Sequence, residues 1–260
     1  MPTRSRRPLA EKGEGLTSLS PQPGSGHGEE HSAYELRSFG RRRGRAPSAR
    51  QRHLLDVVLP RVALPLGEVC PADVASLFPT GPSAVWLEIG FGGGEHLAWQ
   101  AQANPDAGII GCEVFEDGVV KLLSAIDTGG LKNVRVSNED ARGVLRWLPA
   151  GSLDRVFILF PDPWPKRRHV KRRLINRALL DELARVMRPG GELRVATDIG
   201  DYLRTLLTAF HGHPAFTWQV KGPHDWRARG ADWPGTRYEA KAVREGRRSY
   251  FLRFRRAGDG

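Results

Sequence analysis

Short apolar runs alternate with helix-like stretches along most of this chain. Four runs are rich in bulky and branched side chains, as in strands buried on both faces of a parallel sheet: residues 84–89, 108–114, 134–136 and 156–160. Helical patterns occur at residues 95–103, 116–125, 144–148, 174–187 and 201–210. Later runs predict further strands at residues 192–198, 216–220 and 249–254. Alternating strands and helices with short connections predict an α/β fold built on a doubly wound sheet.

The N-terminal segment differs in composition from the rest of the chain. Residues 1–33 are mainly Pro, Gly, Ser, Arg and Glu, and such a segment cannot offset the entropy of ordering its backbone. We therefore expect a disordered tail at 1–33 and one large domain at 34–260. No apolar stretch follows the first arginines or approaches the ~20 residues of a membrane span, so neither a secretory signal nor a membrane segment is expected.

Positive charge is the most pronounced feature of the composition. The net charge is +11 and comes mainly from arginine clusters, which favours an anionic partner, above all nucleic acid. One cluster spans residues 37–52 and leads into an apolar run at 54–59 that predicts a short amphipathic helix. We expect these arginines to form either an arm that touches a phosphate backbone or a plain basic linker.

Cysteine and histidine usage narrows the kinds of site. Cys70 and Cys112 are the only two cysteines, too few for a disulfide framework or a zinc site, so we expect a reducing compartment, the cytoplasm. The eight histidines show no metal-ligand spacing, and no metal is expected. Both a monomer and a homodimer are compatible with the sequence.

A glycine-rich turn follows the first predicted strand. Gly90, Gly92 and Gly94 allow positive φ angles and a close approach of the backbone to a ligand, and a predicted helix comes next. A dinucleotide-binding fingerprint would place its third glycine at position 95, where the chain has Glu95. This counts against a nicotinamide-dependent enzyme. Alone, the turn predicts either a cofactor loop or a simple strand-to-helix connection.

Acidic residues stand at the ends of three successive predicted strands: Glu88, Glu113 and Asp140. Glu113 lies about 20 residues beyond the glycine turn, where an acid can accept hydrogen bonds from ribose hydroxyls. Any one of the three could be a helix cap or a surface acid. Because the carboxyl ends of parallel strands meet at one edge, the three together suit a positively charged nucleoside cofactor with hydroxyl and amine groups.

The strand at 156–160 ends in a proline-framed turn and a basic run. In Pro161-Asp162-Pro163-Trp164-Pro165 the prolines fix φ and remove backbone donors, so the chain leaves the sheet with Asp162 and Trp164 at the strand's carboxyl end. Six of the eight residues at 166–173 are Lys or Arg, which no core is expected to absorb. The segment predicts a ligand-binding edge with a cationic patch for polyphosphate, or else a plain turn and a solvated loop.

These motifs resemble those of known methyltransferases. Glu88-Ile89-Gly90-Phe91-Gly92-Gly93-Gly94 resembles the first motif of S-adenosylmethionine-dependent methyltransferases, whose fold is a seven-stranded Rossmann-like sheet. Phe160-Pro161-Asp162-Pro163-Trp164 and the basic run after it are similar to the signature of bacterial tRNA (guanine-46-N7)-methyltransferases. Ala196-Thr197-Asp198 and Thr236-Arg237-Tyr238-Glu239 resemble two further blocks of that family. The resemblance covers roughly residues 39–254 and implies the class I methyltransferase fold.

The resemblance also implies which residues form the site. It places the cofactor S-adenosylmethionine against Glu88, Gly90, Gly92, Glu113, Asp140 and Asp162. It places tRNA and the target base against Lys166, Asp198, Thr236, Arg237, Tyr238 and Glu239. Further RNA contacts would fall on Arg168, His169, Val170, Lys171, Arg172 and Arg173. The family usually has Lys-Phe where this chain has Arg237-Tyr238, which keeps charge and ring but alters the donor geometry.

Methylation of guanine N7 fits these residues chemically. N7 already carries an in-plane lone pair, so transfer from a sulfonium needs alignment rather than a strong base. The purine becomes cationic as the sulfonium loses its charge, so a fixed carboxylate beside the path stabilises the migrating charge, and Asp162 is the predicted catalytic residue. Two alternatives remain: a methyltransferase for an exocyclic amine of DNA or RNA, and an RNA-binding module that kept the fold and lost the cofactor.

Overall fold

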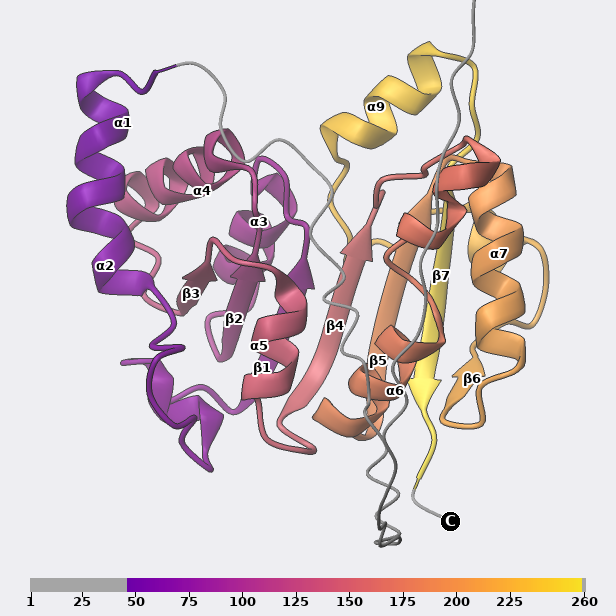
Figure 1. The fold of residues 1–260 in the computed structure, drawn as a ribbon, viewed down its shortest axis with the longest axis horizontal. Helices are drawn as coiled ribbons and strands as arrows, with labels where there is room; N and C mark the ends of the chain where they lie inside the picture. The colour runs from indigo at the N-terminus through magenta and orange to yellow at the C-terminus, as the bar shows by residue number, and fades with distance from the viewer. Residues whose placement is uncertain (1–45, 259–260) are drawn as a thin grey trace, which may run out of the picture. The chain divides into compact units, whose positions relative to one another are not determined.

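A seven-stranded sheet forms the centre of the fold (Figure 1). The computed structural model describes residues 46–258, so the predicted tail at 1–33 and the arginines of 37–45 lie outside the described residues. The strands are β1 Ala84–Ile89, β2 Ala107–Cys112, β3 Val134–Ser137, β4 Leu153–Leu159, β5 Met187–Thr197, β6 Phe216–Trp218 and β7 Tyr250–Arg256. Their order is β3-β2-β1-β4-β5-β7-β6, in which β1 to β5 are parallel and β7 runs antiparallel to both β5 and β6. The predicted doubly wound α/β sheet is confirmed.

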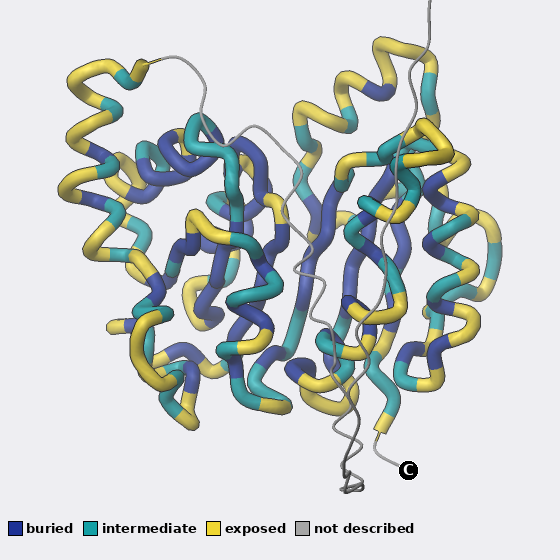
Figure 2. Tube along the Cα trace, in the orientation of Figure 1, coloured by how far each residue is buried: buried dark blue, intermediate teal, exposed yellow. Residues whose placement is uncertain are grey.

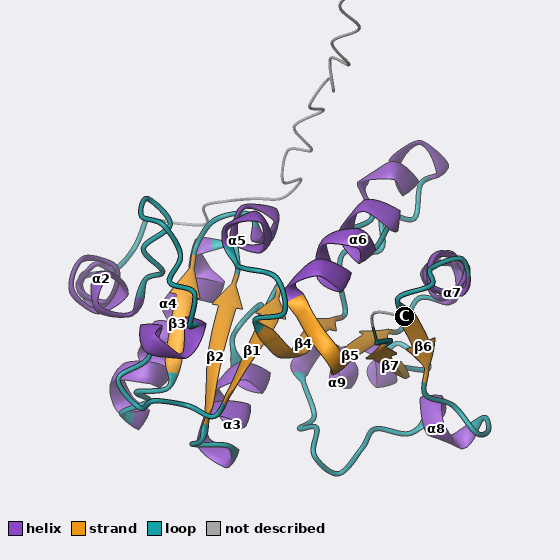
Figure 3. Ribbon diagram, turned by 90° about the horizontal axis from the view of Figure 1, so that it is seen from below, coloured by secondary structure: helices purple, strands orange, loops and turns teal. Residues whose placement is uncertain are grey.

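Helices cover both faces of the sheet (Figure 3). One face carries α5 (Ala141–Trp147), α6 (Arg177–Val186) and α7 (Gly200–His211). The other carries α3 (Glu95–Ala103) and α4 (Glu116–Gly129). The other helical elements are α1 Ala49–His53, a π-helical turn Leu54–Val58, α2 Leu59–Val62, α8 His224–Arg227, α9 Arg237–Arg244, and 3-10 turns at Val74–Leu77 and Arg167–Arg172.

Two buried apolar layers hold these helices to the sheet. One layer joins Leu87, Ile158 and Val195 of the strands to Leu145, Leu180 and Leu206 of α5, α6 and α7. The second joins Trp86, Ile109 and Phe157 to Leu97 and Leu123 of α3 and α4. Buried residues accordingly follow the strands and the inner sides of the helices (Figure 2). Because both faces of the central strands are covered, these strands are continuous apolar runs rather than alternating ones.

Several element boundaries differ from the predictions. Helix α6 begins at Arg177 rather than at 174, because the Asn176 side chain accepts a hydrogen bond from the Leu179 amide (3.1 Å) and caps the helix there. Strand β5 begins at Met187, which pairs with Leu153, and so includes the Pro-Gly-Gly segment that was predicted to separate helix from strand. Within residues 46–258, no helix is long and apolar enough to cross a membrane.

Candidate active site

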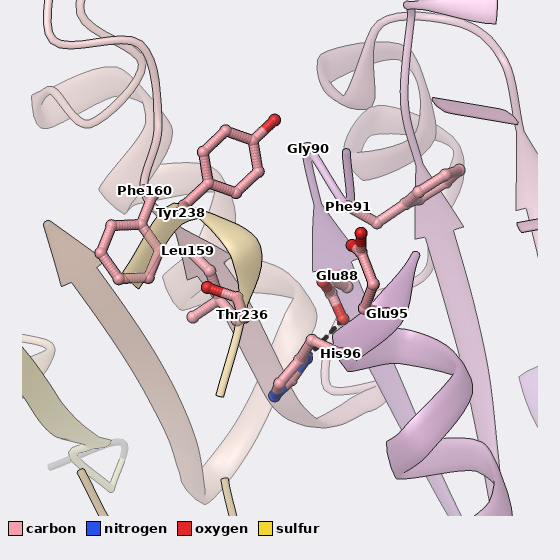
Figure 4. Close-up of a pocket in the computed structure, with 9 residues that line it drawn as sticks. All are labelled: Glu88, Gly90, Phe91, Glu95, His96, Leu159, Phe160, Thr236 and Tyr238. Carbon is pink, nitrogen blue, oxygen red and sulfur yellow. Dashed lines mark hydrogen bonds and ion pairs between the residues drawn. The ribbon is translucent and has the colours of Figure 1, made fainter. Parts of the chain in front are cut away.

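The carboxyl ends of β1 and β4 meet the first turn of α9 around a small cavity (Figure 4). Its lining comes from both the glycine turn and the segment after β4: Glu88, Gly90, Phe91, Glu95, His96, Leu159, Phe160, Thr236 and Tyr238. The cavity measures about 10 Å³, which is room for about one water. Two predicted cofactor residues, Glu88 and Gly90, therefore lie beside two predicted substrate residues, Thr236 and Tyr238.

The glycine turn is held by the side chain of Glu113, the residue that follows β2. Gly90 and Gly92 have φ angles of +73° and +58°, which side-chain-bearing residues rarely adopt. The Glu113 carboxylate accepts from the Gly92 amide and, with its other oxygen, from the Phe115 amide, both at 2.9 Å. Helix α4 packs closely against the same turn. A Cβ added at Gly118 would lie only 2.1 Å from the Gly92 carbonyl oxygen, so only glycine fits at this position of the helix. Glu113 thus fixes the turn from one side and Gly118 fixes it from the other.

Glu88 is buried and bonded to a residue that the sequence analysis missed. Its Oε2 lies 2.7 Å from Nδ1 of His96, and the two side chains are 3% and 2% exposed (Figure 4). In the described part of the chain this is the one hydrogen bond of the Glu88 side chain. The sequence around His96 does not predict this hydrogen bond, because β1 and α3 come into contact only in the folded chain.

Asp140 caps a helix, which was one of the two interpretations of the strand-end acids. It accepts from the Arg142 amide at 3.0 Å and so begins α5, and its carboxylate also pairs with the Arg142 guanidinium. Burial tends to raise the pKa of Asp140. The hydrogen bonds from Arg142 and its positive charge have the larger opposite effect, so the pKa of Asp140 lies below its usual range. Neither Asp140 nor Glu113 lines the cavity.

Asp162 lies in a strained turn directly after β4. Phe160 and Trp164, on either side of the Pro-Asp-Pro segment, have φ angles of +51° and +42°, where residues other than glycine are uncommon. The Asp162 side chain reaches solvent, yet burial by the surrounding protein atoms raises its pKa. Because Phe160 lines the cavity, the proline-framed turn and the glycine turn open at the same edge of the sheet.

The basic segment forms a 3-10 turn rather than the predicted loop. Lys166, Arg167, Arg168 and Lys171 are exposed, whereas the Arg172 guanidinium lies 5.1 Å from the Trp164 ring and His169 meets the same ring edge-on. Burial and the neighbouring cations Arg172, Arg168 and Lys166 lower the pKa of His169, so it adds no charge at neutral pH. Val170 is half-buried. The cationic patch therefore consists of Lys and Arg side chains around one tryptophan.

Arg173 departs from the prediction that no core absorbs this run. It is 3% exposed, and its Nε donates to the Pro163 carbonyl oxygen at 2.9 Å. The same guanidinium binds the Asp201 carboxylate and the Thr205 hydroxyl of α7. Its charge is satisfied within the protein, and it ties the turn that bears Asp162 to α7, so the structure gives Arg173 a supporting contact where the resemblance predicts an RNA contact.

The residues predicted to contact substrate have protein partners as well. Asp198, at the end of β5, accepts from Nε of Arg247 at 2.8 Å. Thr236 caps α9 by accepting from the Glu239 amide at 3.2 Å, and Glu239 pairs with Arg229 at 3.1 Å. These contacts order the residues before any RNA is present.

The first turn of α9 lies over the glycine turn. Arg237 approaches Glu95 at 3.5 Å, and the Tyr238 ring stacks on Phe160 with centroids 6.3 Å apart. A Cβ on Gly92 would lie 3.0 Å from the Tyr238 hydroxyl oxygen. Tyr238 thus closes one side of the cavity, and Arg237 lies against the glycine turn beside it. Among residues 46–258, no group of three or more His, Cys, Asp or Glu side chains is placed to hold a metal ion.

Comparison with known proteins gives a consistent set of relatives. A family model described as "Putative methyltransferase" matches residues 82–252. A tRNA (guanine-N(7)-)-methyltransferase of Rhodospirillum rubrum is 53% identical over 225 residues, which cover 85% of this chain and 88% of that protein. Enzymes of the same name from Brucella anthropi and Rhizobium meliloti are each 47% identical and cover 83% and 84% of this chain, and 93% and 94% of their own lengths.

Proposed function

Because this chain belongs to the tRNA (guanine-N7)-methyltransferase family, we propose that it transfers a methyl group from S-adenosylmethionine to N7 of a guanine in tRNA. The observation that carries this proposal is the shared edge of the sheet, where one cavity is lined by Gly90 and Phe91 of the glycine turn, by Phe160 directly before the proline-framed turn, and by Thr236 and Tyr238 at the start of α9. The resemblance of the sequence motifs extends the proposal to the guanine at position 46.

The residues at this edge fit a nucleoside cofactor. A Cβ on Gly90 would meet no atom within 4 Å, so the backbone of the turn is open on that side. Glu88 uses one carboxylate oxygen for His96, which leaves the other to accept a hydrogen bond. The bound cofactor would supply a methyl group made electrophilic by its sulfonium. At about 10 Å³ the cavity is too small for it, so the Tyr238 side chain, which lines the cavity, has to move aside.

Asp162 is proposed to act by its charge and position. Guanine N7 offers its lone pair without prior deprotonation, so no general base is required. The purine gains positive charge as the new bond forms, and a carboxylate held in the turn between two strained residues is preorganised to stabilise it. Partial desolvation, which raises the Asp162 pKa, also strengthens its field at the reacting atoms.

RNA binding is proposed on two sides of the cavity. The exposed side chains of Lys166, Arg167, Arg168 and Lys171, together with Arg172, would meet phosphates. Asp198 and the segment 236–239 would contact the target nucleotide, and glutamate and threonine oxygens there can accept from or donate to a base edge. The Tyr238 ring offers a stacking surface for an unpaired base once it leaves Phe160.

The experiment that tests the function uses the whole chain, unmodified tRNA and S-adenosylmethionine carrying a labelled methyl group. Digestion of the product is expected to give labelled 7-methylguanosine. Labelled N6-methyladenosine would instead support a methyltransferase for exocyclic amines. Binding of tRNA with neither cofactor binding nor label transfer would support the non-catalytic RNA-binding module.

Binding of tRNA is expected to weaken steeply with salt. With Arg173 removed from the patch, Lys166, Arg167, Arg168, Lys171 and Arg172 remain, and five phosphate contacts predict a slope of about −4 in log affinity against log salt concentration. Filter binding or fluorescence anisotropy over a salt series measures the slope. An affinity that does not change with salt would contradict the assignment of this patch to phosphates.

Replacing Arg173 by Met is expected to lower kcat about tenfold while KM for tRNA and the salt slope change little, because the side chain holds the Asp162 turn rather than RNA. Asp201 is 57% exposed and stays hydrated without its partner, so the variant is expected to fold. Arg168→Met is the matched control: it should raise KM for tRNA and reduce the slope by about one. Equal effects of the two substitutions on tRNA binding would contradict the role given to Arg173.

A further inference from the structure

A chain of buried polar side chains leads from Glu88 away from the cavity. His96 bonds to Glu88 through Nδ1, and its Nε2 lies 3.2 Å from Nε2 of Gln100, one turn further along α3. Gln100 also donates to the main-chain oxygen of Asp232 at 3.1 Å. His96 is 3% exposed and Gln100 2%. Buried polar groups of this kind stabilise a single arrangement when every member has a partner.

The hydrogen bonds around Gln100 determine the tautomer of His96. Asn104 donates through Nδ2 to the main-chain oxygen of Gln100 at 2.9 Å and to its Oε1 at 3.1 Å. Because Oε1 accepts from Asn104, Nε2 of Gln100 is the amide nitrogen, and it donates to both Asp232 and His96. Nε2 of His96 therefore accepts and carries no proton. The proton lies on Nδ1, which donates to Glu88.

The His96 ring is also fixed by aromatic packing. It meets Phe157 edge-on with centroids 4.7 Å apart and Trp233 at 6.2 Å. Trp233 is buried and comes three residues before Thr236, the residue that begins α9. The ring thus has one orientation, in which its Nδ1–H points at Glu88. Figure 4 shows this contact at the wall of the cavity, away from the Phe160 and Tyr238 rings.

From this arrangement we propose that His96 is a positioning residue for cofactor binding. By donating to Oε2 it holds the Glu88 carboxylate in one orientation, so that the other oxygen can receive a hydroxyl or amine of the nucleoside. The proposal rests on the proposed function, since it requires that S-adenosylmethionine binds at Glu88. Without the Nδ1–H donor, Glu88 would be buried without a partner and free to rotate.

Calorimetric titration with S-adenosylmethionine tests this role in the absence of tRNA. His96→Phe keeps the ring packing and removes the donor, and it is expected to raise the cofactor Kd about tenfold, the effect of losing one hydrogen bond to a charged group. His96→Asn places an amide N–H near the Nδ1 position and should restore the Kd to within about threefold of the unmodified chain. Asn133→Leu is the control, because it removes a buried amide that bonds the other end of α3 through the Ala101 oxygen at 3.0 Å. That control should leave the Kd unchanged.

Nitrogen NMR of the unmodified chain gives an independent readout. We expect the His96 signals of a neutral ring protonated on Nδ1, and Gln100→Leu should alter the Nε2 signal. Equal weakening by His96→Phe, His96→Asn and Asn133→Leu, or a Nε2-protonated ring, would overturn the proposal. Failure of the unmodified chain to bind S-adenosylmethionine would remove the proposed function itself, and this inference with it. Normal methylation of tRNA together with full cofactor binding by His96→Phe would remove the inference alone.

Discussion

Replacing Asp162 by Asn is expected to lower kcat for tRNA methylation about 100-fold, with little change in tRNA affinity. The substitution keeps the size of the side chain but removes the charge that stabilises the developing purine cation, and a single preorganised group of this kind contributes about 10²-fold or more. Single-turnover methylation of saturating tRNA measures the effect. Asp154→Asn is the control, because Asp154 lies at the opposite end of β4 and accepts from the Val85 amide, a contact that an amide oxygen can keep.

The pH profile gives a second readout of the same substitution. Burial raises the pKa of Asp162, so the carboxylate that methyl transfer needs is lost, as pH falls, at a higher pH than for an ordinary aspartate. The activity of the unmodified chain is therefore expected to fall as the pH is lowered through the Asp162 pKa. The low activity of Asp162→Asn should not show this decrease at acidic pH. A folded Asn variant with near-normal kcat and the same decrease at acidic pH would show that Asp162 only shapes the turn.

Replacing Gly118 by Ala is expected to weaken cofactor binding about 100-fold. The new methyl group would lie 2.1 Å from the Gly92 carbonyl oxygen, so the glycine turn must shift by about an ångström, a displacement that can cost about 10²-fold. Titration with S-adenosylmethionine measures the loss. The effect should fall on the cofactor more than on tRNA, because the basic segment does not contact α4 through this glycine.

Gly143→Ala is the matched control for that prediction. Gly143 also lies in a helix, but an added Cβ there meets no atom within 4 Å, so the variant should bind cofactor normally and be slightly more stable, as helix propensity predicts. If Gly118→Ala bound cofactor as well as Gly143→Ala does, the contact between α4 and the glycine turn would not shape the cofactor site.

The strands were predictable because their side chains carry the information locally. Apart from Glu88, the residues of runs 84–89 and 156–160 are all apolar, and a strand buried on both faces needs little more. Helix α9 was missed because it is short and four of the eight residues from Arg237 to Arg244 are charged, so its few apolar residues give little signal in the sequence. The Thr236 and Glu239 pair at its start has the spacing of a capping box, which was the available signal.

The parts of the site that depend on tertiary contacts could not be predicted from the sequence. Composition shows that residues 166–173 are cationic, but not that Arg173 turns inward to Pro163 and α7. His96 is one histidine among eight, and only the packing of α3 on β1 brings it to Glu88. Motifs thus indicated the edge of the sheet that bears the candidate site, whereas burial and hydrogen bonding separate the exposed charged side chains there from those that are bonded inside the protein.

In the proposed mechanism, one bound nucleoside spans the edge from Glu88 to Asp162. A crystal structure of the chain with S-adenosylhomocysteine, the product of the donor, would show this arrangement. We expect that the ribose or amino acid part bonds to Glu88 above the glycine turn, that the sulfur lies beside the proline-framed turn, and that Tyr238 has moved off Gly92. A ligand bound on another face, or one whose sulfur lies far from Asp162 while Glu88 stays out of contact, would contradict it.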